Sequence, residues 1–83
     1  MGYKITFKQS VWKDLKRLDK ADATRILEKI EHELAEQANQ YPILTGKFSG
    51  LRKYRLGKYR IIYTLQEETV LILRIGHRSD VNR

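Results

Sequence analysis

The side chains with the most distinctive chemistry are five cations in the second half of the chain: Lys53, Arg55, Arg60, Arg74 and Arg78. Alternate side chains of a strand share a face, so Lys53 and Arg55 lie together if their segment is a strand. If the faces of neighbouring strands coincide, all of these cations except Arg74 converge on one concave patch. Such a cluster is costly without an anion, and the guanidinium fork matches phosphate oxygens in pairs. The pattern therefore predicts a phosphate-binding face.

The distribution of charge supports a polyanionic or acidic partner. Residues 1–45 hold eight Lys/Arg and seven Asp/Glu, a balance of +1, whereas residues 46–83 hold nine Lys/Arg and three Asp/Glu, a balance of +6. Nearly all of the net charge of +7 therefore lies in the second half. The alternative is a surface charged for solubility, which more often mixes both signs.

Length and composition limit the class of protein. Eighty-three residues, 41% of them hydrophobic and 33% charged, predict one soluble globular domain. The absence of cysteine excludes disulfides, thiolate nucleophiles and cysteine-ligated metals, and neither histidine has a metal partner at ligand spacing. No apolar run reaches the length of a signal peptide or a membrane span. We therefore expect a cytoplasmic protein with no cofactor, no metal and no membrane partner.

The elements that position the cations can be predicted from periodicity. Residues 3–8 alternate as a strand, and residues 11–18 form a short helix that Ser10 can cap. Apolar residues of the second helix fall at positions 23, 26, 27, 30, 34 and 38, and Tyr41-Pro42 ends it. Three further strands follow a loop at 43–50, with turns at Gly57-Lys58 and at residues 66–68.

These elements predict an α+β fold in the order β-α-α-β-β-β. Two N-terminal helices pack on one face of a small, mainly antiparallel four-stranded sheet, because their apolar stripes and one face of the sheet need mutual cover. The last three strands form an antiparallel meander. The other face of the sheet stays partly open and carries the basic residues.

The combined motifs resemble the RelE/ParE superfamily of bacterial and archaeal toxins. The basic-x-basic strand corresponds to Lys53-Tyr54-Arg55, the hairpin motif to Gly57 through Tyr63, and the terminal motif to Ile75 through Asn82. The N-terminal segment 3–19 and the amphipathic second helix also match. The resemblance covers nearly the whole chain and implies one toxin domain over residues 1–83.

The resemblance implies a toxin of a type II toxin–antitoxin system that acts as a ribosome-dependent mRNA interferase. Such an endoribonuclease cuts mRNA in the A site without a metal ion, by attack of the 2′-OH on the adjacent phosphate. The matching residues place Lys53 and Arg55 near the 2′-OH, Arg60 on the phosphate and Arg78 at the leaving group. Arginine stays protonated, so a base would have to be Lys53.

Further residues are expected to bind the substrate around these four catalytic candidates: Arg52, Lys58, Arg74, His77, Asn82 and Arg83. His77 could also act as a catalyst, but alternation places its ring beneath the helices, where a structural role is favoured. Asn82 stands where the family often has a tyrosine that stacks on a base, so it predicts weak cleavage.

Two other functions remain open at this point. A ParE-type toxin would inhibit DNA gyrase with the same fold and no nuclease activity, and an inert relative would only bind RNA or the ribosome. Arg60, Arg78 and the Lys53/Arg55 pair favour the nuclease. Each alternative implies an acidic cognate antitoxin as partner, and the nuclease also implies the ribosome with its mRNA.

Overall fold

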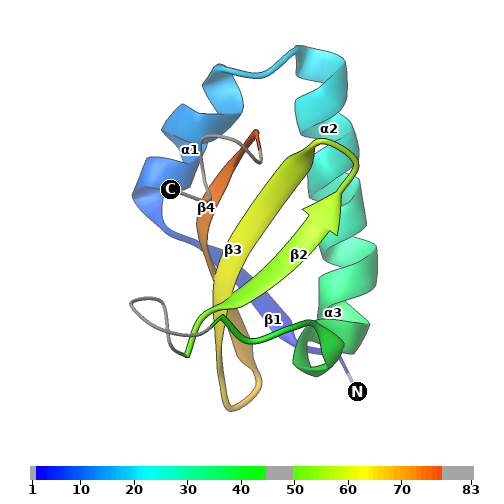
Figure 1. Cartoon of the computed structure of the whole chain (residues 1–83), viewed down its shortest axis with the longest axis vertical. Helices are drawn as coiled ribbons and strands as arrows, with labels where there is room; N and C mark the ends of the chain where they lie inside the picture. The colour runs from blue at the N-terminus through cyan, green and yellow to red at the C-terminus, as the bar shows by residue number, and fades with distance from the viewer. Residues whose placement is uncertain (1, 45–49, 78–83) are drawn as a thin grey trace.

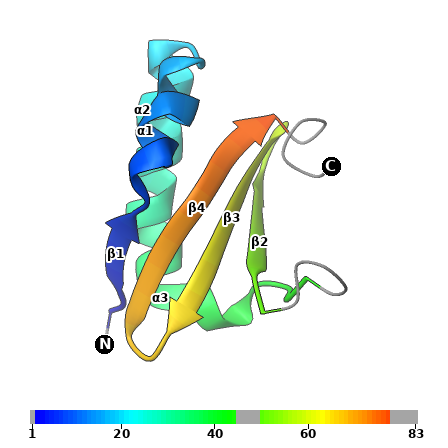
Figure 2. The ribbon, with the colours of Figure 1, turned by 90° about the vertical axis from the view of Figure 1, so that its left-hand side faces the viewer.

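The computed structural model describes residues 2–44 and 50–77. The sheet has four strands, and the helices of the described residues all lie on one of its faces (Figures 1 and 2). The sheet order is β1-β4-β3-β2. The strands are β1 (Lys4–Phe7), β2 (Arg52–Leu56), β3 (Tyr59–Gln66) and β4 (Thr69–His77). The helices are α1 (Gln9–Lys16), α2 (Lys20–Lys29), the π-helix η1 (Ile30–Leu34), α3 (Ala35–Gln37) and the 3₁₀-helix η2 (Ala38–Gln40).

The predicted fold class is wrong about the sheet. The sheet is mixed, because β1 pairs parallel with β4, from Lys4 opposite Thr69 to Phe7 opposite Ile72. Only the pairs β2–β3 and β3–β4 are antiparallel. Alternation along residues 3–8 shows which side chains face the core, but it carries no information on strand direction or on the neighbouring strand. The helices between β1 and the other strands supply the long crossover that a parallel pair requires.

The second helix is also longer than predicted. α2 starts at Lys20, three residues before the first apolar position, and continues through η1 and α3 to η2. The Ala23 N–H donates to the Asp19 carbonyl at 2.9 Å, so the residues between the two predicted helices already form the first turn of α2. The two predicted helices are therefore a short α1 and one long joined helix.

A π turn keeps the joined helix aligned with the core. Ile26, Ile30, Leu34 and Ala38 are spaced by four residues, and all four are 0% exposed. In a regular α-helix a four-residue spacing overshoots a full turn by about 40° at each step. The wider hydrogen bonding of η1 corrects this drift. At the far end the Tyr63 hydroxyl donates to the Ala38 carbonyl at 2.5 Å, which ties η2 to the central strand β3.

Strand alternation divides the sheet into two faces. The buried residues of β2, β3 and β4 that face the helices belong to one hydrophobic core with α1, α2 and η1: Tyr54, Tyr59, Ile61, Tyr63, Val70, Ile72 and Ile75. Gly57, with φ of 60°, forms the tight β2–β3 turn that sets this register. Within the described residues no helix is long and apolar enough to cross a membrane.

Burial of Tyr54 makes the stability depend on alkaline pH. Burial raises the pKa of Tyr54 to about 12, and Tyr41 and Glu33 add to this rise. An unfolded tyrosine titrates near pH 10, so above that pH the folded state binds more protons than the unfolded state. We expect the free energy of unfolding to fall between about pH 10 and the raised pKa of about 12. Urea unfolding across this window should show a smaller fall for Tyr54→Phe, and equal falls would contradict the assignment.

Candidate functional site

Three cations of β2 and β3 lie on the open face of the sheet: Lys53 and Arg55 of β2 and Arg60 of β3. We call this set the basic face. Arg55 is the direct cross-strand partner of Arg60, and Lys53 is the partner of Ile62. Directly opposed side chains have Cβ atoms about 5 Å apart and diagonal neighbours about 7–8 Å apart. Arg60 is therefore next to Arg55 and diagonal to Lys53, as the sequence predicted from alternation.

Arg60 has the most unusual environment of the three. Its Nε and Nη1 atoms are buried and have no hydrogen-bond partner within the part of the chain that the structure describes. Leaving a buried donor unsatisfied costs about 1–3 kcal/mol, and more when the group is charged. An anion that accepted both hydrogen bonds would recover this cost. Two N–H donors on one guanidinium match the geometry of an oxyanion with two acceptor oxygens, such as a phosphate.

Arg60 has small or uncharged neighbours at its paired position on β4 and at the next same-face position of β3. Its partner on β4 is Gly76, which has no side chain, and its neighbour Ile62 is 6% exposed. Neither contributes a carboxylate that could neutralise the guanidinium. A ligand could therefore approach the sheet backbone closely beside Arg60.

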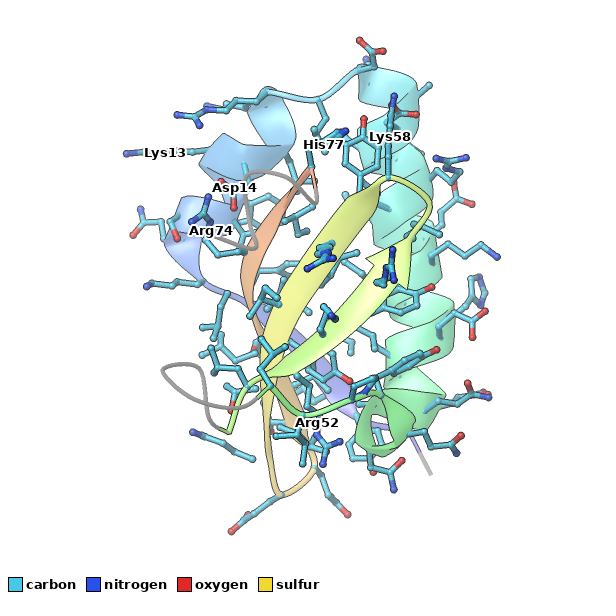
Figure 3. The ribbon with its side chains drawn as sticks, in the orientation of Figure 1. Lys13, Asp14, Arg52, Lys58, Arg74 and His77 are labelled. Atoms are coloured by element: carbon cyan, nitrogen blue, oxygen red, sulfur yellow. The ribbon has the colours of Figure 1, made fainter. Side chains whose placement is uncertain are left out.

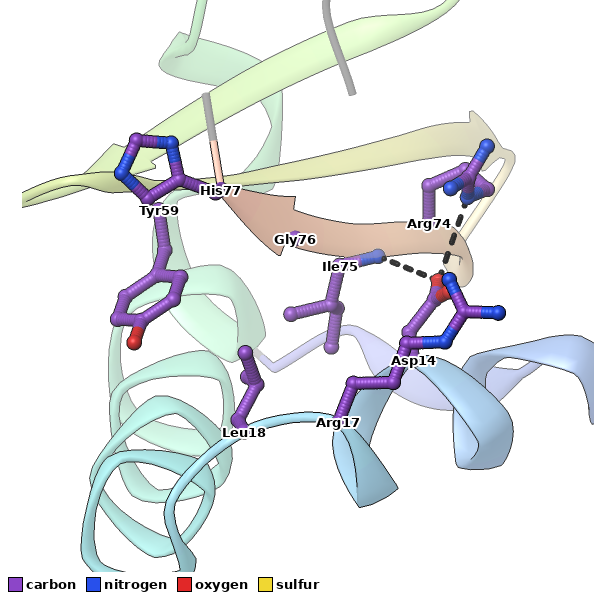
Figure 4. Close-up of a pocket in the computed structure, with 8 residues that line it drawn as sticks. All are labelled: Asp14, Arg17, Leu18, Tyr59, Arg74, Ile75, Gly76 and His77. Atoms are coloured by element: carbon purple, nitrogen blue, oxygen red, sulfur yellow. Dashed lines mark hydrogen bonds and ion pairs between the residues drawn. The ribbon is translucent and has the colours of Figure 1, made fainter. Parts of the chain in front are cut away.

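Arg74 of β4 is the cross-strand partner of Ile62, so its backbone position is diagonal to Arg60, but its side chain turns to the sheet edge and we leave it out of the basic face. Its Nε lies 3.3 Å from Oδ2 of Asp14 in α1, and its side chain is 52% exposed (Figures 3 and 4). The pair spans 60 positions of sequence, so no local pattern could have predicted it. This contact holds Arg74 at the edge of β4, and its substrate-binding role stays a prediction.

Arg52 and Lys58 make contacts outside the basic face. The Nη1 atom of Arg52 donates to the Tyr41 carbonyl at 2.8 Å and contacts the Asn39 carbonyl at 3.3 Å, which fastens the segment after η2 to β2. Lys58, in the exposed β2–β3 turn, places its Nζ 5.6 Å from the centre of the Tyr59 ring. Neither position tests the predicted substrate-binding roles.

His77 ends β4 on the helix side of the sheet, where alternation placed it. Its ring stands edge-on to Tyr59, with the centroids 6.3 Å apart. Both rings line a pocket of about 240 Å³ between α1 and the end of the sheet (Figure 4). The other lining residues are Asp14, Arg17, Leu18, Arg74, Ile75 and Gly76. The imidazole therefore faces away from Arg60.

The remaining predicted site residues, Arg78, Asn82 and Arg83, lie outside the described residues. Among the residues that are described, no group of three or more His, Cys, Asp or Glu side chains could hold a metal ion.

Sequence reasoning missed an apolar groove between α1 and α2. It has a volume of about 420 Å³ and is lined by Trp12, Leu15, Lys16, Leu18, Lys20, Ala23 and Leu27. Trp12 is 46% exposed although it packs on Phe7, with ring centroids 5.1 Å apart. Trp12 follows Val11, which with Leu15 forms the buried side of α1, and a large aromatic residue next to that side was the available signal. The groove offers a surface for a partner with apolar side chains.

Comparisons with known proteins give a consistent set of relatives. The model of the family described as "ParE toxin of type II toxin-antitoxin system, parDE" matches residues 5–82. Toxin RelG of Mycobacterium tuberculosis is 31% identical over 90 residues, covering 100% of this chain and 99% of that protein.

Two solved structures extend this likeness to three dimensions. A chain of the M. tuberculosis toxin–antitoxin complex RelBE2 has a TM-score of 0.88 at 26% identity, over 94% of this chain and 100% of that chain. A chain of the archaeal RelE–RelB complex from Pyrococcus horikoshii has a TM-score of 0.67 at 29% identity, over 98% and 100%. The likeness therefore extends along nearly the whole chain.

Proposed function

This chain belongs to the family of ParE toxins of type II toxin–antitoxin systems, within the RelE/ParE superfamily, and from this premise we propose that it is a ribosome-dependent mRNA endoribonuclease. The whole chain, residues 1–83, would form one toxin domain that acts in the cytoplasm. One observation carries the proposal: the Nε and Nη1 atoms of Arg60 are buried on the open face and have no hydrogen-bond partner among residues 2–44 and 50–77. A scissile phosphate is the ligand that would satisfy them.

The proposed reaction needs three actions at one phosphate. The 2′-OH loses a proton and attacks the phosphorus, negative charge builds on the phosphoryl oxygens, and the 5′-oxygen leaves with a proton. Arg60 would stabilise the developing charge, and Lys53 is the only member of the basic face that can act as a base. Arg55 would hold the substrate beside them, and we assign protonation of the leaving oxygen to Arg78. The reaction needs no metal ion.

Primer extension on an mRNA, with and without programmed ribosomes, tests this function. Cuts that require ribosomes and disappear in Arg60→Met would support it. Uncut mRNA in the presence of a toxin that still arrests growth would overturn it.

Inhibition of DNA gyrase is the second candidate, because the matching family model is that of ParE toxins. The same fold would then bind gyrase and use the basic face without chemistry. A supercoiling assay separates the two functions, since a gyrase inhibitor stops supercoiling and leaves ribosome-bound mRNA intact.

An antitoxin is the partner that the relatives suggest, because RelBE2 and the archaeal RelE–RelB structures are toxin–antitoxin complexes. We propose that a cognate antitoxin places an acidic amphipathic segment in the groove between α1 and α2. Its apolar side chains would contact Trp12 and Leu27, and its carboxylates would meet Lys16 and Lys20 at the rim.

Truncation of Trp12 is expected to weaken antitoxin binding. A half-exposed tryptophan that becomes buried at an interface typically contributes 2 kcal/mol or more, so Trp12→Ala should raise the Kd by about thirtyfold. Titration calorimetry with the purified antitoxin measures the change. Ile43→Ala is the matched control, because Ile43 is also exposed, at 54%, but lies outside the groove. Equal effects of the two substitutions would remove the groove from the interface.

A further inference from the structure

The outer edge of β4 is paired with β1 over only the first half of the strand. β1 ends at Phe7, opposite Ile72, and the Lys8 N–H then donates to the Ile72 carbonyl at 2.9 Å. α1 packs on β4, and its Asp14 reaches the strand at Ile75, beyond the end of β1. Unpaired strand edges fray and expose backbone groups, so this edge needs a substitute for the missing strand.

Asp14 of α1 supplies a hydrogen-bond acceptor in place of the missing strand. Its Oδ2 atom accepts a hydrogen bond from the backbone N–H of Ile75 at 3.0 Å, and the same oxygen lies 3.3 Å from the Nε of Arg74 (Figure 4). The Asp14 side chain is only 12% exposed. One carboxylate therefore holds both the backbone and a side chain of the strand end.

The pairing pattern links this contact to Arg60. The N–H and C=O groups of one strand residue point to the same edge, and those of the next residue point to the opposite edge. Because the Ile75 N–H points outward to Asp14, the backbone groups of Gly76 point inward to β3. On β3, the cross-strand partner of Gly76 is Arg60. The Asp14 contact thus fixes the strand segment that lies beside Arg60.

We propose that Asp14 is a positioning residue for the basic face. It anchors the end of β4 so that Gly76 stays paired beside Arg60, and it holds Arg74 at the sheet edge. The effect on catalysis rests on the proposed nuclease function, whereas the anchoring itself does not. Asp14 lies on the helix side of the sheet and acts through β4, so it needs no contact with the substrate.

Three substitutions separate the components of this contact. Asp14→Ala removes both the acceptor and the charge, and Asp14→Ser is a second variant whose side chain is too short to reach Ile75. Asp14→Asn keeps an acceptor oxygen for the Ile75 N–H and removes only the charge. Arg74→Ala removes the ion pair and leaves the backbone contact in place.

Two NMR readouts test the anchoring without any assay of activity. In Asp14→Ala and Asp14→Ser we expect the amides of Ile75 and Gly76 to exchange at least about tenfold faster, because the local opening of the strand end becomes easier. We also expect the Arg60 Nε–H signal to shift. Asp14→Asn and Arg74→Ala should leave both readouts close to those of the wild type. An unchanged Arg60 signal in both Asp14→Ala and Asp14→Ser would overturn the proposal.

Cleavage kinetics then test the consequence for catalysis. A misplacement of about 1 Å can cost about a hundredfold, so we expect kcat of Asp14→Ala to fall about 10–100-fold with a smaller change in KM. Faster amide exchange with an unchanged kcat would make Asp14 purely structural and overturn the positioning role. If the wild type does not cleave, the proposed nuclease fails, and the Arg60 signal alone decides whether Asp14 positions the basic face.

Discussion

Replacing Arg60 by methionine is expected to lower kcat for mRNA cleavage by about 10²–10³-fold and to raise the free energy of unfolding by about 1–3 kcal/mol. The loss of activity follows from removing a preorganised donor to the transition-state phosphate. The gain in stability follows because the Nε and Nη1 atoms are buried without partners in the described part of the free protein. Methionine keeps the unbranched stem and removes these unsatisfied donors.

The opposite signs of the two effects make this substitution informative. Single-turnover cleavage gives kcat, and urea unfolding of the free toxin gives the stability. Arg25→Met is the matched control, because Arg25 is 58% exposed on α2 and pairs only loosely with Asp22, at 3.9 Å. That control should keep full activity and stay within about 0.5 kcal/mol of the wild-type stability. A destabilised Arg60→Met with normal cleavage would mean that Arg60 serves the fold.

Arg60→Lys tests whether the shape of the guanidinium matters beyond its charge. A lysine keeps the positive charge but cannot offer two parallel donors to one phosphate. We expect this variant to cleave faster than Arg60→Met and slower than the wild type.

The sequence was sufficient to predict elements whose geometry is local. The hairpin over β2 and β3 follows from Gly57-Lys58 and from alternation, and this alternation places Lys53, Arg55 and Arg60 on one face. The burial of Ile26, Ile30 and Leu34 follows from their helical spacing. In these cases a period of two or of about four residues fixes the direction of each side chain relative to its neighbours.

Features that depend on long-range pairing could not be predicted. Alternation along β1 is the same for a parallel and an antiparallel partner, so the sheet was wrongly expected to be mainly antiparallel. The contact of Asp14 with Ile75 joins residues 61 positions apart, and a lone aspartate in an amphipathic helix does not indicate it. The burial of Arg60 Nε and Nη1 without a partner in the described part of the chain depends on how the strands and helices pack together.

Affinity for single-stranded RNA is expected to fall about a hundredfold when the salt concentration rises tenfold. Each phosphate contact on a single strand contributes about 0.7 log units per tenfold change in salt, so the three cations of the basic face predict a slope of about −2. Fluorescence anisotropy of a labelled oligonucleotide between about 50 and 500 mM KCl measures the slope. The free toxin is suitable, because its basic face is not covered by the helices (Figure 2).

The slope of each variant shows which cations contact phosphate. Arg60→Met should make the slope shallower by about 0.7, and Arg55→Met by a similar amount, whereas Arg25→Met should leave it unchanged. Arg60→Met should also lose affinity at every salt concentration. The two buried donors of Arg60 gain hydrogen bonds when phosphate binds, whereas the exposed side chain of Arg55 already donates hydrogen bonds to water. A flat profile for the wild type would contradict phosphate binding by this face. A steep profile that Arg60→Met leaves unchanged would assign the contacts to other cations of a chain with net charge +7.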